Sequence, residues 1–402
     1  MSHHSFIEKN RQLIADFSAT QDVPFYAYDI DGLATHIKQL VNDDIKLWFA
    51  VKANPLSSVI KTLANQGMQF DVASSGELDQ VLAQGVKPEH ILNTGPAKSL
   101  AQITHFFEQG VSVFVAESAN QLALINQQAK VFNVVPSILL RVQLRFEQDS
   151  DNPLGGNELT PFGLGSDEWN DVDLSQFDQI NVIGLHIFQW GNMLEADALI
   201  DLWQAMVSPL KALAMAMGFE LSVLDLGGGL GVPYEGDERR LDWETLKQAL
   251  IKIKTQAGVD ELWLELGRFA VAEYGYYINR VVDVKNNYQQ DLVVMQGGIN
   301  HLLRPAITSQ PFPTCLLRNS SASALPFHIH GPLCTSLDKL GTLSLPSDVQ
   351  IDDILIFSQC GAYGFTESMP FFLCHELPAE VIVIDGDVET IRPALPASSY
   401  LF

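Results

Sequence analysis

Short apolar runs alternate with amphipathic segments between residues 46 and 266 of the chain. Each run is too short for a core helix and is typical of a buried strand. Eight alternations of strand and helix predict parallel pairing and closure into an eight-stranded (β/α) barrel of the TIM type, an α/β fold. The apolar runs are residues 46–51, 70–73, 91–93, 111–116, 137–144, 182–187, 223–226 and 262–266.

Helices are expected between most of these strands. A further helix is predicted over residues 6–17 and a strand over residues 25–29. The gap at residues 145–180, rich in Gly and Pro between Asn152 and Gly165, predicts an ordered active-site loop and a short helix near residues 167–171. The amphipathic segments are residues 57–66, 76–84, 100–108, 120–128, 196–217 and 243–255.

After Arg268 the period changes to strand-like runs without long helices between them. This indicates a separate β domain, with Asp385-Gly386-Asp387 as the tight turn of a terminal hairpin. We therefore expect a barrel domain over residues 30–274, and a β-sandwich or β-barrel domain from residues 1–29 and 275–402. The strand-like runs are residues 277–284, 292–296, 327–330, 353–358 and 380–384.

Composition limits the class of protein. With 402 residues, 47% of them hydrophobic, the chain can bury a large core in two domains. A net charge of −24 argues against nucleic acid and anionic membrane surfaces as partners. There is no apolar signal segment at residues 1–10 and no window long enough to span a bilayer, so a soluble cytoplasmic protein is expected. The cysteines fit a reduced compartment and match no zinc pattern, and no metal is expected; they are Cys315, Cys334, Cys360 and Cys374.

Lys52 is the unusual residue of the first barrel strand. It ends the apolar run that begins at Trp48, and Pro55 stops the run from continuing. Most lysines in such a place extend to solvent. A partly desolvated amine, however, loses its proton easily enough to form a Schiff base.

Other polar residues occur at or near the ends of the predicted strands, where the catalytic groups of a TIM barrel lie. Each has an ordinary alternative: a glycine run is often only a flexible turn, an arginine a surface charge, and a histidine a satisfied core residue. Together they suit a phosphate cradle, a carboxylate for a protonated pyridine nitrogen and an aromatic stacker, which describes a site for pyridoxal 5'-phosphate (PLP). These residues are Asp71, Asn93, Arg141, His186, Asp225, Gly227 to Gly231, Glu265 and Arg268.

The chain resembles the fold-type III PLP-dependent decarboxylases, the ornithine, arginine and diaminopimelate decarboxylase family with an alanine-racemase-like fold. The likeness covers nearly the whole chain. The motifs that carry it are Phe49-Ala50-Val51-Lys52-Ala53-Asn54, Phe70 to Leu78, Gly227 to Gly231, Glu265-Leu266-Gly267-Arg268, Gly331-Pro332-Leu333-Cys334 and Gly361-Ala362-Tyr363.

The resemblance implies roles for single residues. Lys52 would bind the cofactor covalently, His186 would stack on its ring, and Cys334 would return a proton to Cα after loss of carbon dioxide. The segment ending at Cys334 resembles one that a neighbouring subunit contributes, which implies a homodimer whose active sites are completed by the β domain. The other implied cofactor contacts are Asp71, Arg141, Gly228, Gly229, Glu265, Arg268 and Tyr363.

Departures from the family pattern concern the substrate. Diamine-forming members have an acidic residue directly after the cysteine, and this chain has Thr335. Arg304 matches an arginine that binds a substrate carboxylate, although Ile307 replaces the expected tyrosine. Small residues usual after the stacking histidine are replaced by the bulky run Phe188-Gln189-Trp190. The expected substrate-binding residues are Arg304, Arg318, Thr335 and Asp338.

This pattern favours an amino acid or conjugate whose far end is neutral or anionic. Similarity to decarboxylases of citrate-based siderophore biosynthesis suggests citryl-serine or citryl-diaminopropionate as the substrate. The enzymatic alternatives are a diaminopimelate- or ornithine-type decarboxylase of primary metabolism and an alanine-racemase-like enzyme, which needs a tyrosine as second base. A non-catalytic relative would lose the lysine or the cofactor contacts, and both are present here.

Overall fold

The computed structural model describes residues 3–145 and 159–401, and half of the predicted loop between Asn152 and Gly165 lies outside these residues. The chain forms two compact units. We call the first the barrel unit, His36–Gly231 with Arg239–Ala270, and the second the sheet unit, Met1–Thr35 with Val232–Glu238 and Val271–Phe402. Among the described residues no helix combines the length and the apolar character needed to cross a membrane.

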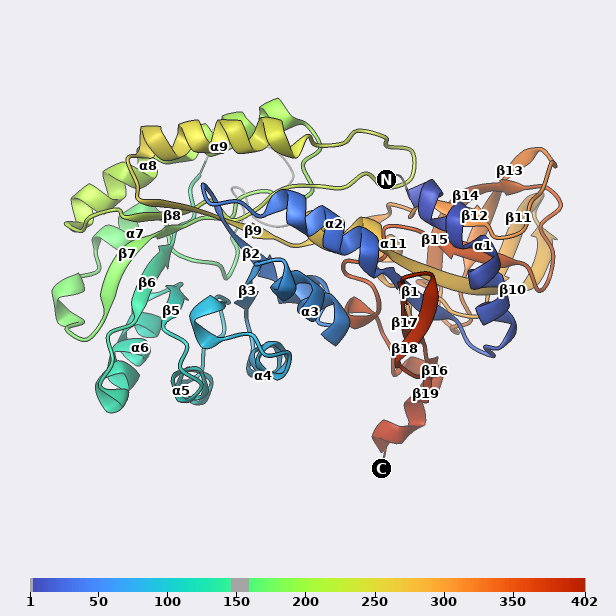
Figure 1. Ribbon diagram of the computed structural model, residues 1–402, viewed down its shortest axis with the longest axis horizontal. Coiled ribbons are helices and arrows are strands. Elements are labelled where there is room, and N and C mark those ends of the chain that lie inside the picture. Colours follow the sequence, from blue (N-terminus) through green and yellow to red (C-terminus); the bar gives the residue numbers. More distant parts are fainter. Residues whose placement is uncertain (1–2, 146–158, 402) are drawn as a thin grey trace. The chain divides into compact units, whose positions relative to one another are not determined.

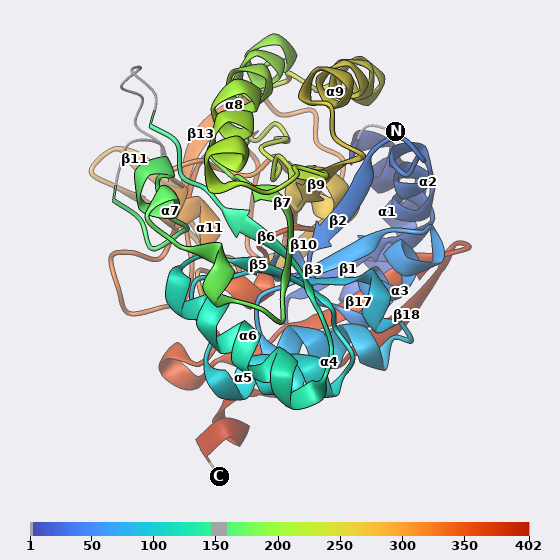
Figure 2. The ribbon, with the colours of Figure 1, turned by 90° about the vertical axis from the view of Figure 1, so that its left-hand side faces the viewer.

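The barrel unit contains a closed barrel of eight parallel strands, β2 to β9, in chain order (Figure 2). This confirms the predicted fold class, and every predicted apolar run coincides with one strand. The strands are β2 (Lys46–Ala50), β3 (Gln69–Val72), β4 (Ile91–Asn93), β5 (Val113–Ala116), β6 (Ser137–Arg141), β7 (Asn181–His186), β8 (Val223–Asp225) and β9 (Glu261–Leu266).

Helices of the barrel unit surround these strands on the outside (Figures 1 and 2), whereas α2 and α10 each cross the boundary between the two units. Several begin at a residue whose side chain accepts a backbone N–H of the first turn, as Ser74 does from Glu77 and Asp242 does from Thr245. The helix α2 follows β1 without a break and was not predicted. The helices are α2 (Ile30–Leu40), α3 (Ser57–Asn65), α4 (Ser75–Ala83), α5 (Leu100–Glu108), α6 (Ala119–Phe132), α7 (Ser166–Asn170), α8 (Ala196–Met217), α9 (Trp243–Ala257) and α10 (Arg268–Val271).

The strand register aligns the residues at the carboxyl ends of neighbouring strands. Ala50, two residues before Lys52, pairs with Asp71, while Arg141 pairs with His186 and His186 pairs with Asp225. Because all strands are parallel, these residues share one rim of the barrel.

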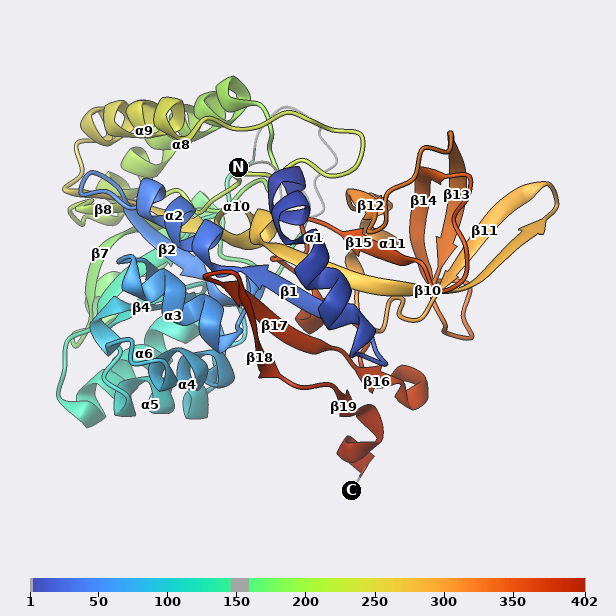
Figure 3. The ribbon, with the colours of Figure 1, turned by 45° about the vertical axis from the view of Figure 1, so that its right-hand side comes forward.

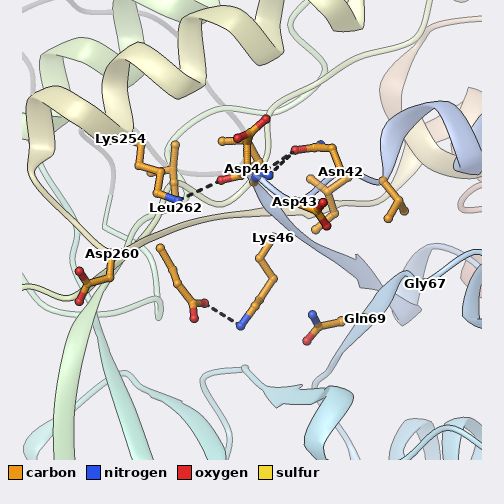
Figure 4. A pocket seen from close by; sticks show the side chains of 13 residues that line it. Asn42, Asp43, Asp44, Lys46, Gly67, Gln69, Lys254, Asp260 and Leu262 are labelled. Carbon is orange, nitrogen blue, oxygen red and sulfur yellow. Dashed lines mark hydrogen bonds and ion pairs between the residues drawn. The ribbon is translucent and has the colours of Figure 1, made fainter.

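The opposite end of the barrel contains a charged cavity of about 290 Å³ (Figure 4). Lys46, the first residue of β2, forms an ion pair of 2.6 Å with Glu261 and lies 4.8 Å from the ring centroid of Trp263. The amine of Lys254 donates a hydrogen bond to the carbonyl of Asp44. Inside the barrel, Trp48 and Trp263 pack with four buried aliphatic residues, so the interior is a packed core. The aliphatic residues are Leu92, Val115, Leu139 and Val223.

The sheet unit is built on a nine-stranded sheet, whose main path runs β14-β13-β11-β10-β1-β17-β18 (Figure 3). The predicted hairpin is confirmed: Asp385 and Gly386, both with positive φ, join β17 to β18. The elements are α1 (His3–Ala19), β1 (Phe25–Asp29), β10 (Gly275–Asn287), β11 (Gln290–Met295), α11 (Arg304–Thr308), β12 (Thr314–Leu316), β13 (Ala324–His330), β14 (Lys339–Pro346), β15 (Ile354–Phe357), β16 (Glu376–Leu377), β17 (Ala379–Ile384), β18 (Asp387–Arg392) and β19 (Leu395–Pro396).

Residues distant in sequence stabilise this sheet. Strand β1 pairs with β10 in the antiparallel sense and with β17 in the parallel sense, so the N-terminal segment lies between two C-terminal strands. Helix α1 packs on the sheet through Phe6, whose ring stacks on Tyr276 at 4.4 Å. The sheet unit therefore requires residues from both ends of the chain.

Close packing of β7 on β8 predicts that Gly184→Ala is destabilising. A Cβ at residue 184 would lie 2.1 Å from the carbonyl oxygen of Val223, so the two strands would have to separate. We expect a loss of about 1–3 kcal/mol in the free energy of unfolding, measured by urea denaturation. Gly76→Ala is the matched control, because its Cβ would meet nothing closer than 4.0 Å and Ala favours helix α4. Equal stability of the two variants would contradict the packing argument.

Candidate active site

Lys52 lies directly after strand β2, in the short 3-10 turn η1 (Val51–Ala53). Its neighbours Val51 and Ala53 are buried, whereas the lysine side chain is exposed. The positive charge of Lys52 opposes the burial that raises the pKa of Asp71 and Glu77. The amine therefore faces carboxylates at the predicted rim.

His186 and Glu265, from β7 and β9, form a pair in which the histidine is buried and the glutamate side chain is 10% exposed. His186 Nε2 lies 2.9 Å from Glu265 Oε1, and the histidine is 1% exposed. Burial alone would raise the pKa of Glu265, but the charge and hydrogen bond of His186, with Lys52 and Arg141, bring it below its usual range. Glu265 is thus held as a carboxylate inside the barrel.

Two further carboxyl groups surround this pair. Burial, and then the charge of Glu265, raise the pKa of Asp71 to about 8 and the pKa of Asp225 well above its usual value. The hydroxyl of Thr94 donates to Asp71 at 2.5 Å, and the N–H of Gly227 donates to Asp225 at 2.8 Å. The site favours an added positive charge, because three carboxyl groups share one buried region.

Arg141 is held by residues that the sequence did not single out. Its Nη1 donates to Glu117 at 3.1 Å, and its guanidinium lies 4.4 Å from the ring centroid of Phe162. The buried amine of Lys98 has its pKa lowered to about 8 by burial and then by the charge of Arg141, with Glu117 opposing the shift. Glu117 directly follows strand β5, so its place at a strand end could have identified it.

The glycine loop, Gly227 to Gly231, follows β8 and packs against the backbone of β9 and the side chain of Phe188. A Cβ on Gly228 would lie 2.2 Å from the carbonyl oxygen of Glu265, and one on Gly227 would meet the Phe188 side chain at 2.9 Å. Within the described residues, no group accepts a hydrogen bond from the N–H of Gly228 or Gly229. Arg268, 8% exposed, begins α10 just after β9. Backbone N–H groups of this kind can bind a phosphate.

In the sheet unit, Arg304 and Tyr363 lie together. The guanidinium is 4.4 Å from the ring centroid of Tyr363, and Glu367, which the sequence did not single out, is 2.8 Å from Arg304. Arg318 is engaged elsewhere, because it donates to Asp353 and Asp348.

Cys334, Thr335 and Asp338 share the loop between β13 and β14. The thiol of Cys334 is exposed, while Asp338 is 1% exposed and accepts the backbone N–H groups of Ile299 and Leu333 at 2.8 and 2.7 Å. The structure therefore gives Asp338 a part in shaping the loop that presents Cys334.

The barrel residues fit PLP. His186 Nδ1 and Asp225 Oδ2 are buried and have no hydrogen-bond partner among the described residues. A carboxyl oxygen of Asp225 and one of Glu265 lie within 4.8 Å of each other, and two carboxyl groups at this spacing suit a cationic group. A protonated pyridine nitrogen is such a group, the glycine loop suits a phosphate, and Lys52 supplies an amine.

Comparison with known proteins decides the family. Residues 29–272 match the family described as "Pyridoxal-dependent decarboxylase, pyridoxal binding domain". The chain belongs to this family. It is a PLP-dependent decarboxylase, a carboxy-lyase acting on a small substrate of the amino-acid type.

Relatives of this decarboxylase differ in substrate. It is 28% identical to the 2-[(L-alanin-3-ylcarbamoyl)methyl]-2-hydroxybutanedioate decarboxylase of Staphylococcus aureus (strain NCTC 8325 / PS 47), with 88% of this chain and 92% of that protein covered. It is 30% identical to the diaminopimelate decarboxylase of Vibrio cholerae, with 96% and 93% covered. The fold matches the diaminopimelate decarboxylase of Helicobacter pylori with a TM-score of 0.86 at 24% identity, covering 96% of this chain and 98% of that one.

The raised pKa of Asp71 predicts a pH dependence of stability. The folded chain keeps the Asp71 proton up to about pH 8, whereas the unfolded chain loses it near pH 4. Unfolding therefore releases a proton in this window, and the free energy of unfolding falls as pH rises. We expect Asp71→Asn to make this fall shallower by up to about 1.4 kcal/mol per pH unit, measured by urea unfolding between pH 5 and 7.5 without added cofactor.

The exposed Asp43→Asn variant is the control for this measurement, and its slope should equal that of the unaltered protein. An unchanged slope in Asp71→Asn would show that Asp71 is ionised in the folded protein at neutral pH.

Proposed function

We propose that this decarboxylase removes the α-carboxylate of an amino-acid conjugate whose remote end carries carboxylate groups, of the citryl-diaminopropionate or citryl-serine type. The observation that carries the proposal is Arg304, held by Glu367 beside the ring of Tyr363. Thr335 after Cys334 removes the acidic residue that would hold a distal ammonium. The S. aureus relative, by its name, acts on a hydroxybutanedioate conjugate.

The barrel residues would share the work at the cofactor. Lys52 supplies the amine for covalent attachment, and the Glu265 carboxylate holds a proton at the pyridine nitrogen. Gly228 and Gly229 offer N–H groups to the phosphate, with Arg268 close by in the chain. When bound, PLP supplies an electron sink for the electron pair left at Cα as carbon dioxide departs.

Other residues orient these groups or handle the substrate. His186 fixes the Glu265 carboxylate by a 2.9 Å hydrogen bond, and its imidazole would lie against the ring of the bound cofactor. Asp71 and Arg141 add a buried hydrogen-bonding group and a cation. Cys334 delivers the proton to Cα from a loop that Asp338 shapes, and Arg304, rather than the doubly paired Arg318, binds the remote carboxylate.

We further propose that the enzyme is a cytoplasmic homodimer with shared active sites. The exposed Cys334 supports this proposal, because an acid that serves the reaction must be covered when it acts. Leu337, three residues later, is 67% exposed, and a second subunit would bury this apolar side chain.

The substrate proposal predicts the outcome of a direct assay. Carbon dioxide release by the PLP-loaded protein should occur with citryl-diaminopropionate or citryl-serine, and should be at least about tenfold slower with free lysine or ornithine, because no acid follows Cys334. Lys52→Ala should lose both activity and the visible absorbance of the bound cofactor. Release confined to the free diamino acids would contradict the proposal.

Diaminopimelate belongs in the same assay as the alternative substrate. The V. cholerae relative carries the name of a diaminopimelate decarboxylase, and the remote end of diaminopimelate also bears a carboxylate. Release from diaminopimelate alone would place the enzyme in lysine metabolism. Inversion of an amino acid without carbon dioxide release would indicate a racemase.

The dimer proposal predicts complementation between two inactive variants. Lys52→Ala and Cys334→Ala, mixed in equal amounts and allowed to exchange subunits, should regain about one quarter of the normal activity, since one site of each mixed dimer has both residues. Light scattering checks the dimer mass. A dimer that shows no recovered activity after proven subunit exchange would show that each site uses residues of a single chain.

A further inference from the structure

Arg304 and Glu367 form an ion pair with an unusual hydrogen-bonding arrangement. A single nitrogen, Nη1, donates to both carboxylate oxygens of Glu367, each at 2.8 Å. The face of the guanidinium lies against Tyr363. The arginine side chain is only 13% exposed, so its position is fixed from two sides.

The remaining edge of the guanidinium is open. Within the described residues, Nε and Nη2 of Arg304 donate to no acceptor. This Nε/Nη2 edge is the one that binds a carboxylate through two parallel hydrogen bonds. Glu367 therefore leaves the carboxylate-binding edge available while it orients the arginine.

Glu367 keeps capacity for another donor. Its carboxylate has about four acceptor positions, and the hydrogen bonds from Nη1 occupy only part of them. A third of its side chain, 33%, is exposed. A ligand carboxylate on the open edge of Arg304 would approach the negative charge of Glu367, which is unfavourable unless the ligand also brings a donor.

We propose that the Arg304–Glu367 pair recognises an α-hydroxy or α-amino carboxylate at the remote end of the substrate. The carboxylate binds the Nε/Nη2 edge of Arg304, and the hydroxyl or ammonium on the same carbon donates to Glu367. Glu367 is thereby a specificity-determining residue that rejects ends with carboxylates alone. This inference deepens the proposed function and rests on it, because the central carbon of a citryl group carries both a hydroxyl and a carboxylate.

The experiment measures binding instead of turnover. Citrate and propane-1,2,3-tricarboxylate, which lacks only the hydroxyl, are titrated into the PLP-loaded protein by calorimetry. We expect citrate to bind about tenfold more tightly, because its hydroxyl makes a hydrogen bond to a charged acceptor. In Glu367→Leu, which accepts no hydrogen bond, this ratio should fall to about one.

Controls assign the effect to this pair. Glu389→Leu removes an exposed carboxylate from the same unit and should keep the tenfold preference. Arg304→Met should lose binding of both acids. A parallel titration with 2-aminopropane-1,2,3-tricarboxylate, in which an amino group replaces the hydroxyl of citrate, distinguishes the amino from the hydroxy form of the ligand.

The outcomes separate this inference from the proposed function. A preference for citrate that persists in Glu367→Leu, or no citrate binding to the unaltered protein, would overturn the role of Glu367. A preference that depends on Glu367, in an enzyme that releases no carbon dioxide from citryl conjugates, would retain the recognition of α-hydroxy carboxylates and refute only the proposed substrate.

Discussion

The mutual repulsion of three carboxyl groups inside one barrel is the constraint on which the site depends. Asp71 and Asp225 are buried at the carboxyl ends of β3 and β8, and the Glu265 side chain in β9 is 10% exposed. Burial of several charges costs several kcal/mol unless they are neutralised. Two of the three have raised pKa values, while Glu265 keeps its charge through His186. A cationic ring nitrogen therefore binds more favourably in this barrel than a neutral one, because only the cation is attracted by the Glu265 carboxylate.

The arginines of the two units differ in how their positive charges are compensated by carboxylates. In the barrel unit, Glu117 lies beside both Arg141 and Lys98, and the charge of Arg141 also lowers the pKa of Glu265. In the sheet unit, Arg318 has two aspartates and Arg304 has one glutamate. Arg141 is thus shared between two carboxylates, whereas Arg318, with both aspartates, is a structural cross-link between its loop and neighbouring turns.

Periodicity was sufficient for most of the fold. Each barrel strand follows from a short apolar run, and parallel register then brings Lys52, Asp71, His186 and Glu265 to one rim without further information. Helix α2 was not predicted, because it follows β1 with no turn signal between Asp29 and Ile30. Glu367 and Lys98 could not be predicted as partners of Arg304 and Glu117. Nothing in the sequence pattern links the two members of either pair, and only packing brings them together.

The aromatic ring of Phe188 supports the glycine loop that follows β8. In sequence, this bulky residue departs from the small residues usual after the stacking histidine, and in the structure its side chain lies where a Cβ on Gly227 would meet it at 2.9 Å. The Phe188 side chain and the backbone of Gly227 are therefore closely packed, so a change in the position of one requires a change in the other. Replacing Phe188 by a small residue would remove the side chain that packs against Gly227, so a larger residue nearby would be needed to keep the shape of the glycine loop.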